Sequence, residues 1–294
     1  MFTPRAQNPV LAALLTLLAS AFVAGTTLLA KMLGTDALGP PLIPLQISQG
    51  RFVFALLALG VAAIVIRLHF TDIAWKTHTM RVFCGWGGVT LMFAAAAFIP
   101  LSDATAISFL NPVIALLLAI PLLKERVGPV RLSAAAIALI GAMVLLRPTP
   151  EAFQPAALLA LGAAIALGFE VIVIKRLTGR EGPMQILLIN NVIGVGIASL
   201  TAIWVWITPT FEQWLALAGI GFLMASAQAC FINAIARADA SFVGPFFYAT
   251  LVFAALYDFA IFGVRPDIVS IIGTVIILCG AGLLMWREAR VKTA

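Results

Sequence analysis

Long apolar runs are the feature of this sequence that most restricts its fold. Each run has about 20 residues, the length that an α-helix needs to cross the hydrocarbon core of a bilayer. Ten such runs predict transmembrane helices at residues 10–32, 45–66, 81–99, 103–122, 130–146, 155–175, 185–207, 213–235, 241–262 and 268–286. We therefore expect an all-α polytopic membrane protein.

Composition excludes several other classes of protein. The chain is 63% hydrophobic and 10% charged, whereas soluble domains average about 45–50% apolar and about 25% charged residues. Its three cysteines all lie in apolar runs, which argues against a disulfide-stabilised secreted scaffold. The net charge is +6, but the basic residues are scattered, so we expect no nucleic-acid partner.

The basic residues predict the orientation in the membrane. With ten spans, one side of the bilayer receives only Lys31, Arg147 and Arg265. The other side holds both termini and receives Arg5, Arg67, Lys76, Arg81, Lys124, Arg126, Arg131, Lys175, Arg176, Arg180, Arg237, Arg287, Arg290 and Lys292. The positive-inside rule then places both termini in the cytoplasm. The apolar run after Arg5 continues to Ala30, too long for the core of a cleavable signal peptide, so we expect it to remain as the first span.

Four pairs of similar segments recur in the same order in the two halves of the chain. They are Leu29–Leu33 with Val173–Leu177, Pro100–Thr105 with Ala236–Ser241, Val127–Pro129 with Val264–Pro266, and Ile140–Ala142 with Cys279–Ala281. They predict two five-helix repeats, residues 1–147 and 148–294. Because five is odd, the second repeat is inverted, an arrangement common in secondary transporters. A duplication kept only for folding is the alternative.

These features resemble a known group of transporters. Ten spans, the Asp-Ala-Thr/Ser sequence that begins the fourth and ninth, and Lys124–Pro129 are similar to the EamA-type branch of the drug/metabolite transporter superfamily. The sequence as a whole is most similar to bacterial inner-membrane exporters of amino acids, particularly aromatic ones. One departure is that Glu125 has no acidic counterpart in Phe262–Pro266.

The resemblance implies a multi-pass protein of the bacterial inner (plasma) membrane that exports small organic metabolites by alternating access. It is then not an enzyme and needs no cofactor; its partners are a small-molecule substrate, the lipid bilayer and, in one reading, a second copy in a homodimer. Nucleotide-sugar or drug-type carriers of the same fold are the main alternative. A polytopic membrane enzyme is a weaker one, because no span carries a clustered catalytic set.

Three charged residues inside predicted spans are candidates for gating or ion coupling, since buried charges in a bilayer usually face a cavity or a partner. Arg51 and Asp258 lie at similar depth below the outer ends of their helices, so we expect them to pair as a gate or as a carboxylate-binding feature; a static ion pair is the alternative. Glu170, nearer the inner side, either exchanges protons or pairs with a base on the cytoplasmic side.

Prolines inside two spans suggest where substrate binds. Pro112 and Pro245 each remove a backbone donor, which frees the carbonyl four residues earlier, on Ser108 and Ser241. Such irregular backbone is tolerated in a bilayer where it lines a cavity. The cavity-lining residues expected from this reasoning and from other polar or aromatic residues at depth are Ser108, Asn111, Pro112, Ser241, Pro245, Tyr248, Trp86, Thr90, Asn191 and Gln228. Plain helix kinks are the alternative.

The two histidines predict no metal site. His69 and His78 fall in the connection before the third predicted span, nine residues apart, without the spacing of metal ligands. We expect both to be solvated, and we expect no metal.

Overall fold

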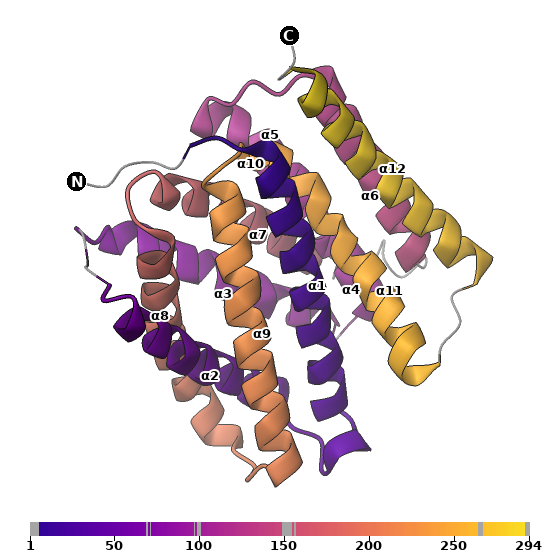
Figure 1. The fold of residues 1–294 in the computed structure, drawn as a ribbon. Coiled ribbons are helices and arrows are strands. Elements are labelled where there is room, and N and C mark those ends of the chain that lie inside the picture. Colours follow the sequence, from indigo (N-terminus) through magenta and orange to yellow (C-terminus); the bar gives the residue numbers. More distant parts are fainter. Residues whose placement is uncertain are drawn as a thin grey trace.

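Helices form all the regular structure in the described part of the chain, which comprises residues 6–68, 70, 72–96, 98, 101–148, 155, 157–263 and 267–291 of a computed structural model (Figure 1). The α-helices are α1 (Pro9–Leu33), α2 (Pro44–Val65), α3 (Trp75–Ala96), α4 (Leu101–Ser108), α5 (Asn111–Leu123), α6 (Pro129–Leu146), α7 (Ala157–Thr178), α8 (Pro183–Ala202), α9 (Phe211–Ile235), α10 (Ala240–Val243), α11 (Ala249–Phe262) and α12 (Ile268–Val291). Three short 3-10 helices are η1 (Asp36–Leu38), η3 (Ile203–Val205) and η4 (Gly244–Tyr248).

Local sequence signals fix where many of these helices begin. A proline occupies the first turn of α1, α2, α6 and α8, where its missing N–H costs nothing. The Asn8 side chain accepts a hydrogen bond from Leu11 N at 3.1 Å and so caps α1. At the start of α9, Thr210 and Gln213 form a reciprocal capping box, which satisfies two backbone donors that the helix leaves unpaired.

Most predicted spans coincide with observed helices. Among the described residues, nine helical stretches are long and apolar enough to cross a membrane. α3 is not among them, because it carries His78, Arg81 and three glycines. The span predicted at 81–99 begins earlier, at Trp75. The observations support a polytopic membrane protein; the division into two inverted repeats stays a prediction.

Helices from the two halves of the sequence pack against one another. α1 lies beside α9, and α6 lies beside α12 (Figure 1). α3 packs on α7, and α2 packs on α8 and α9. Glycines allow the closest of these approaches: a Cβ on Gly221 of α9 would lie 2.4 Å from Phe54 Cβ of α2, and one on Gly141 of α6 would lie 2.7 Å from Ile277 N of α12. Small residues thus bring backbones into contact, as in other membrane bundles.

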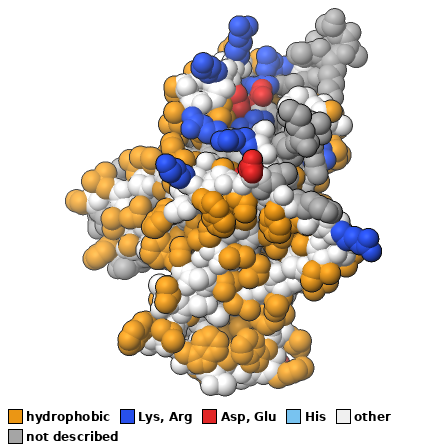
Figure 2. Space-filling model, turned by 90° about the vertical axis from the view of Figure 1, so that its left-hand side faces the viewer, with side chains coloured by type: hydrophobic (Ala, Val, Ile, Leu, Met, Phe, Trp, Pro, Cys, Tyr) orange, Lys and Arg blue, Asp and Glu red, His pale blue; other side chains and the backbone are white. Residues whose placement is uncertain are grey.

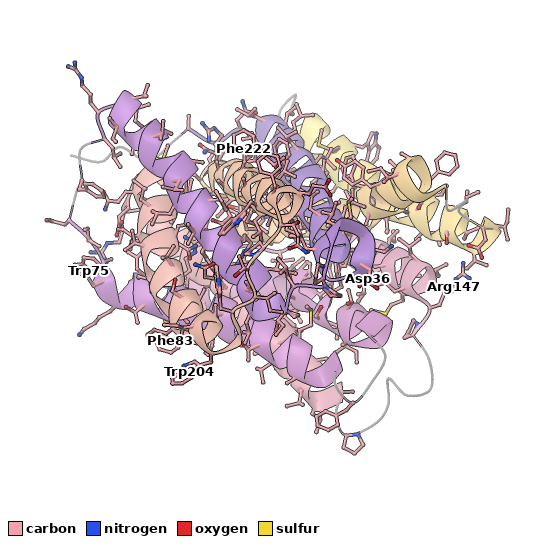
Figure 3. The ribbon with its side chains drawn as sticks, turned by 90° about the horizontal axis from the view of Figure 1, so that it is seen from below. Asp36, Trp75, Phe83, Arg147, Trp204 and Phe222 are labelled. Carbon is pink, nitrogen blue, oxygen red and sulfur yellow. The ribbon has the colours of Figure 1, made fainter. Side chains whose placement is uncertain are left out.

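The surface is divided between apolar and charged regions. Figure 2 shows Lys and Arg side chains gathered toward the upper end of the molecule and hydrophobic side chains over much of the remainder of that face. α1 begins and α12 ends at this same upper end (Figure 1). Phe83 and Trp204, which are 60% and 87% exposed, point away from the bundle when it is viewed from the opposite end (Figure 3). Such a surface suits lipid contact.

Candidate functional site

The two proline-containing spans are broken, and the breaks lie against each other. The predicted span 103–122 is divided into α4 and α5, and the span 241–262 is divided into α10, η4 and α11. A Cβ on Gly244 would lie 3.3 Å from Pro112 O, so the two breaks are in close contact. Proline removes the donor that would continue each helix, and the interruption brings chain from both halves together.

Side chains at these breaks satisfy the freed backbone groups. Asn111 Nδ2 donates to Ser108 O at 2.9 Å, which is the carbonyl that Pro112 leaves unpaired. The Tyr248 hydroxyl donates to Phe109 O at 2.7 Å. Ser108, Pro112, Pro245 and Tyr248 are all buried, so the contacts observed at the breaks are internal ones. A substrate-binding role for these residues stays a prediction.

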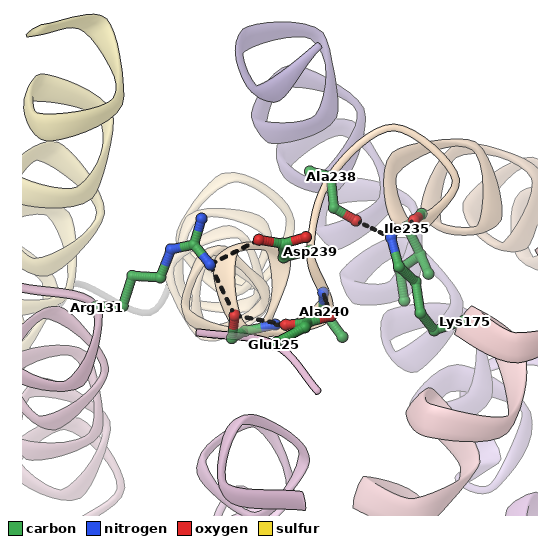
Figure 4. A network of polar contacts seen from close by, with 8 residues as sticks. Glu125, Arg131, Lys175, Ile235, Ala238, Asp239 and Ala240 are labelled. Carbon is green, nitrogen blue, oxygen red and sulfur yellow. Dashed lines mark hydrogen bonds and ion pairs between the residues drawn. The ribbon is translucent and has the colours of Figure 1, made fainter. Parts of the chain in front are cut away.

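A carboxylate that sequence reasoning left without a role joins the two halves near the breaks. Glu125 follows the C-cap of α5, Lys124, which has a left-handed conformation (φ 56°, ψ 31°). Its carboxylate accepts hydrogen bonds from Ala240 N at 2.9 Å, from Ser241 N at 3.1 Å and from Ser241 Oγ at 2.6 Å (Figure 4). Backbone donors at a helix start have no partner within the helix. The Glu125 side chain accepts hydrogen bonds from two of them and so caps α10.

Two basic residues extend this contact, as Figure 4 shows. Arg131 of α6 donates to Asp239 Oδ2 at 2.8 Å and to Ser241 Oγ at 3.1 Å. Lys175, near the end of α7, donates to the carbonyls of Ile235 and Ala238. We call Glu125, Arg131, Asp239, Ala240 and Ser241 the α10 contact. Its partners are more than 100 residues apart in sequence, which is why spacing along the chain did not reveal it.

A second buried network overturns the expectation of a solvated His78. The side chains of His78 on α3 and of Glu181, which follows α7, are both 0% exposed, with Nε2 and Oε2 2.8 Å apart. Glu181 also accepts from Ala74 N at 2.9 Å and from Gln185 Nε2 at 2.7 Å. Burial of this carboxylate is tolerated because two donors and the His78 ring surround it. His69 lies outside the described residues.

The third network contains one of the three charges predicted to matter. Glu170 of α7 faces Arg81 of α3, with Oε1 and Nε 3.6 Å apart. The guanidinium of Arg51 on α2, the second of these charges, lies 4.1 Å from the centroid of the Phe52 ring. Arg81 was assigned to a cytoplasmic connection from the sequence, but its side chain is only 2% exposed. The side chain of Asp258 lies outside the described residues, so its pairing with Arg51 stays a prediction.

The remaining predicted cavity residues divide between the interior and the surface. Asn191 is buried on α8 and donates to Leu187 O at 2.9 Å and to Gln228 Oε1 of α9 at 3.4 Å. Trp86 and Thr90 lie on an exposed face of α3, and the Thr90 hydroxyl donates to Trp86 O at 2.8 Å. The structure thus joins Asn191 with Gln228 but leaves Trp86 and Thr90 apart from them. Within the described residues, no group of His, Cys, Asp and Glu could hold a metal ion.

Known membrane transporters are similar to this chain in sequence. The model of the EamA-like transporter family matches residues 10–147 and 154–286. A riboflavin transporter of Rhizobium johnstonii is 34% identical over 79% of this chain and 75% of its own. One of Vibrio cholerae is 31% identical over 72% of each chain. An S-adenosylmethionine uptake transporter of Rickettsia prowazekii is 25% identical over 86% of each chain.

A solved crystal structure shares the fold. It has a TM-score of 0.80 and covers 95% of this chain and 98% of its own at 19% sequence identity. The family match spans nearly the whole described bundle, including α10, the two helix breaks and the charged residues of α2, α3 and α7. The chain therefore belongs to the EamA-like transporter family, and it is a membrane transporter.

Proposed function

We propose that this transporter carries a small metabolite with a planar heteroaromatic ring, with riboflavin as the first candidate. The observation that carries the proposal is the 34% and 31% identity, over about three quarters of the chain, to proteins named riboflavin transporters. The site suits such a substrate, because it combines few charges with the buried amide of Asn191 and the half-buried amide of Gln228. Polar groups of this kind orient a largely apolar ligand.

The mechanism we propose is alternating access between residues 1–147 and 148–294, taken as inverted repeats in a bacterial inner membrane with both termini in the cytoplasm. Two features support it. The family model matches each half separately, and the α10 contact joins one half to the other at an end of the bundle through bonds that rigid-body separation would break.

A second candidate substrate is S-adenosylmethionine, since a relative named for its uptake aligns over 258 residues. The resemblance also leads us to expect export of aromatic amino acids. This expectation is more specific than the family assignment. Such amino acids have in common with riboflavin and S-adenosylmethionine only that they contain a ring. We keep their export as a third candidate. Transport direction is set by the gradients across the membrane rather than by the fold.

Purified protein in liposomes tests the proposal directly. Radiolabelled riboflavin, S-adenosylmethionine and tryptophan are each supplied outside, with and without a pH gradient, and internal label is measured against protein-free liposomes. We expect riboflavin to enter faster than the other two. Entry of tryptophan or S-adenosylmethionine without riboflavin would overturn the proposed substrate but leave the family assignment intact.

A further inference from the structure

Two oppositely charged side chains from two helices face each other inside the bundle. They are Arg81 on α3 and Glu170 on α7. Charges within membrane spans are costly and usually mark a substrate or ion pathway. Neither the family assignment nor the relatives' names give them a role.

Arg81 forms an ion pair with Glu170. Its side chain is 2% exposed and donates from Nη1 to Ile186 O at 3.3 Å. Arg81 Nε is buried without a hydrogen bond and points to the carboxylate at 3.6 Å, beyond hydrogen-bonding distance. An ion pair of this kind fixes the carboxylate without using up its hydrogen-bond acceptors.

The backbone of α3 also shapes the position of Glu170. Gly85 lies one turn after Arg81, and a Cβ there would lie 2.9 Å from Glu170 Oε2 and 3.0 Å from Oε1. The carboxylate therefore occupies space that any other residue at position 85 would fill. The Glu170 side chain nevertheless keeps 21% of its surface exposed, so a ligand can reach it, whereas it cannot reach Arg81.

The charge balance of the ion pair restricts its ligands. The Arg81 guanidinium compensates the Glu170 carboxylate, so a ligand needs no charge of its own. An ionised carboxylate only accepts hydrogen bonds. A neutral ligand that offers an N–H donor therefore suits this position.

We propose, on the basis of the proposed function, that Glu170 recognises the cyclic imide edge of a flavin-type ring. Its carboxylate accepts a hydrogen bond from the ring N–H. Arg81 is a positioning residue that keeps the carboxylate in place. Hydrogen bonds to charged groups are stronger than neutral ones, so this edge would be a main determinant of specificity.

Binding of two ligands that differ only at the imide tests the proposal. Quenching of flavin fluorescence by the purified protein in detergent gives Kd values for riboflavin and for its N3-methyl derivative, which lacks the N–H. We expect the wild-type protein to bind the methylated ligand at least about tenfold more weakly, as loss of a hydrogen bond to a charged acceptor implies. In Glu170→Gln this ratio should fall, because the neutral amide oxygen accepts a weaker hydrogen bond from the ring N–H than the charged carboxylate does.

Two further variants separate recognition from folding. Gly85→Ala keeps the carboxylate but displaces it, and Arg81→Gln removes its support; we expect both to lower the riboflavin to N3-methylriboflavin ratio while thermal unfolding shows a folded protein. Glu212→Gln, at the exposed start of α9, is the matched control and should keep the ratio of the wild type.

The outcomes also separate this inference from the proposed function. An unchanged ratio in Glu170→Gln and Gly85→Ala, in a protein that transports riboflavin, overturns the imide site alone. If the wild-type protein neither binds nor transports riboflavin, the proposed substrate itself is wrong. Preferential binding of S-adenosylmethionine would overturn the proposed substrate.

Discussion

The carboxylate of Glu125 and the hydroxyl of Ser241 lie 2.6 Å apart, although the two residues are separated by 116 positions in the sequence. This is the shortest bond of the α10 contact, and it joins the chain after α5 to the first turn of α10. Ser241 is 0% exposed and Glu125 is half-buried, so the bond is partly shielded from water. If the two halves separate at this end during transport, the bond must break in each cycle.

Glu125→Gln should destabilise the protein. The amide keeps one acceptor oxygen but loses the charge that strengthens three hydrogen bonds to α10. Losing such bonds to a partly buried carboxylate costs about 1–3 kcal/mol, which a chemical unfolding curve in detergent, followed by tryptophan fluorescence, can resolve. Ser241→Ala should cost less, because the backbone donors of Ala240 and Ser241 remain paired. Equal midpoints for wild type and Glu125→Gln would show that the α10 contact adds nothing to stability.

Tyr248→Phe should also lower stability. The change removes the donor to Phe109 O at 2.7 Å and leaves a carbonyl at the break between α4 and α5 without its partner. The expected cost is about 1–3 kcal/mol for an unsatisfied buried acceptor. The other tyrosine of the chain provides a matched control, since Tyr257 donates to Ala21 O at 3.3 Å. Tyr257→Phe should shift the unfolding midpoint less; a larger shift than that of Tyr248→Phe would contradict this assignment.

Sequence alone predicted the spans better than their contacts. The first predicted span, 10–32, matches α1 at Pro9–Leu33, because an apolar run with proline at its start carries both its length and its boundary. The third, 81–99, missed the first six residues of α3, because Lys76 and His78 look like a solvated connection. His78 is buried only because Glu181 lies against it, 103 residues later in the chain, and local hydropathy cannot show such a partner.

The sequence revealed some residues of the candidate site and not others. Glu170 was recognised as unusual because a charge inside an apolar run is visible in the sequence. Its partner Arg81 was not, because it lies near the end of a run, where a basic residue is an ordinary orientation signal. The sequence shows of Glu125 only that it has no acidic counterpart in the second half, whereas the structure shows an asymmetric contact between the halves. A repeat search finds what is shared and so misses such a residue.

Gly221→Ala should separate α2 from α9. A Cβ at position 221 would lie 2.7 Å from Ala55 N and 2.9 Å from Phe54 C, and backbone cannot move aside as a side chain can. Overpacking of this kind costs about 1–3 kcal/mol. Gly196→Ala on α8 is the control, since nothing lies within 4 Å of its Cβ position; it should be neutral or stabilising by up to about 1 kcal/mol through helix propensity. A Gly221→Ala protein as stable as Gly196→Ala would refute close contact between these helices.

Reporter fusions test the orientation. Green fluorescent protein joined after Ala294 should fluoresce, and alkaline phosphatase at that position should be inactive, because the positive-inside rule places this end in the cytoplasm. Alkaline phosphatase joined after Pro209, in the connection before α9, should be active. The reverse pattern of activities would place both termini outside the cytoplasm.

Asp267 directly precedes α12, and its ionisation should make the stability of the protein depend on pH in the acid range. Hydrogen bonds from the Arg147 side chain and from Ser270 lower the pKa of this exposed carboxyl to about 2. The pKa of an unperturbed aspartate is about 3.9. Because the folded pKa is the lower one, the stabilisation by ionised Asp267 is fully present above about pH 5 and is lost as the pH falls through 4 toward about 2.

The stability difference between wild type and Asp267→Asn should therefore be constant at neutral pH and shrink over this acid range. Asp36→Asn, an exposed acidic residue on η1, corrects for general effects of charge removal. A difference that persists unchanged down to pH about 2 would show that the carboxyl is not held ionised by Arg147 and Ser270.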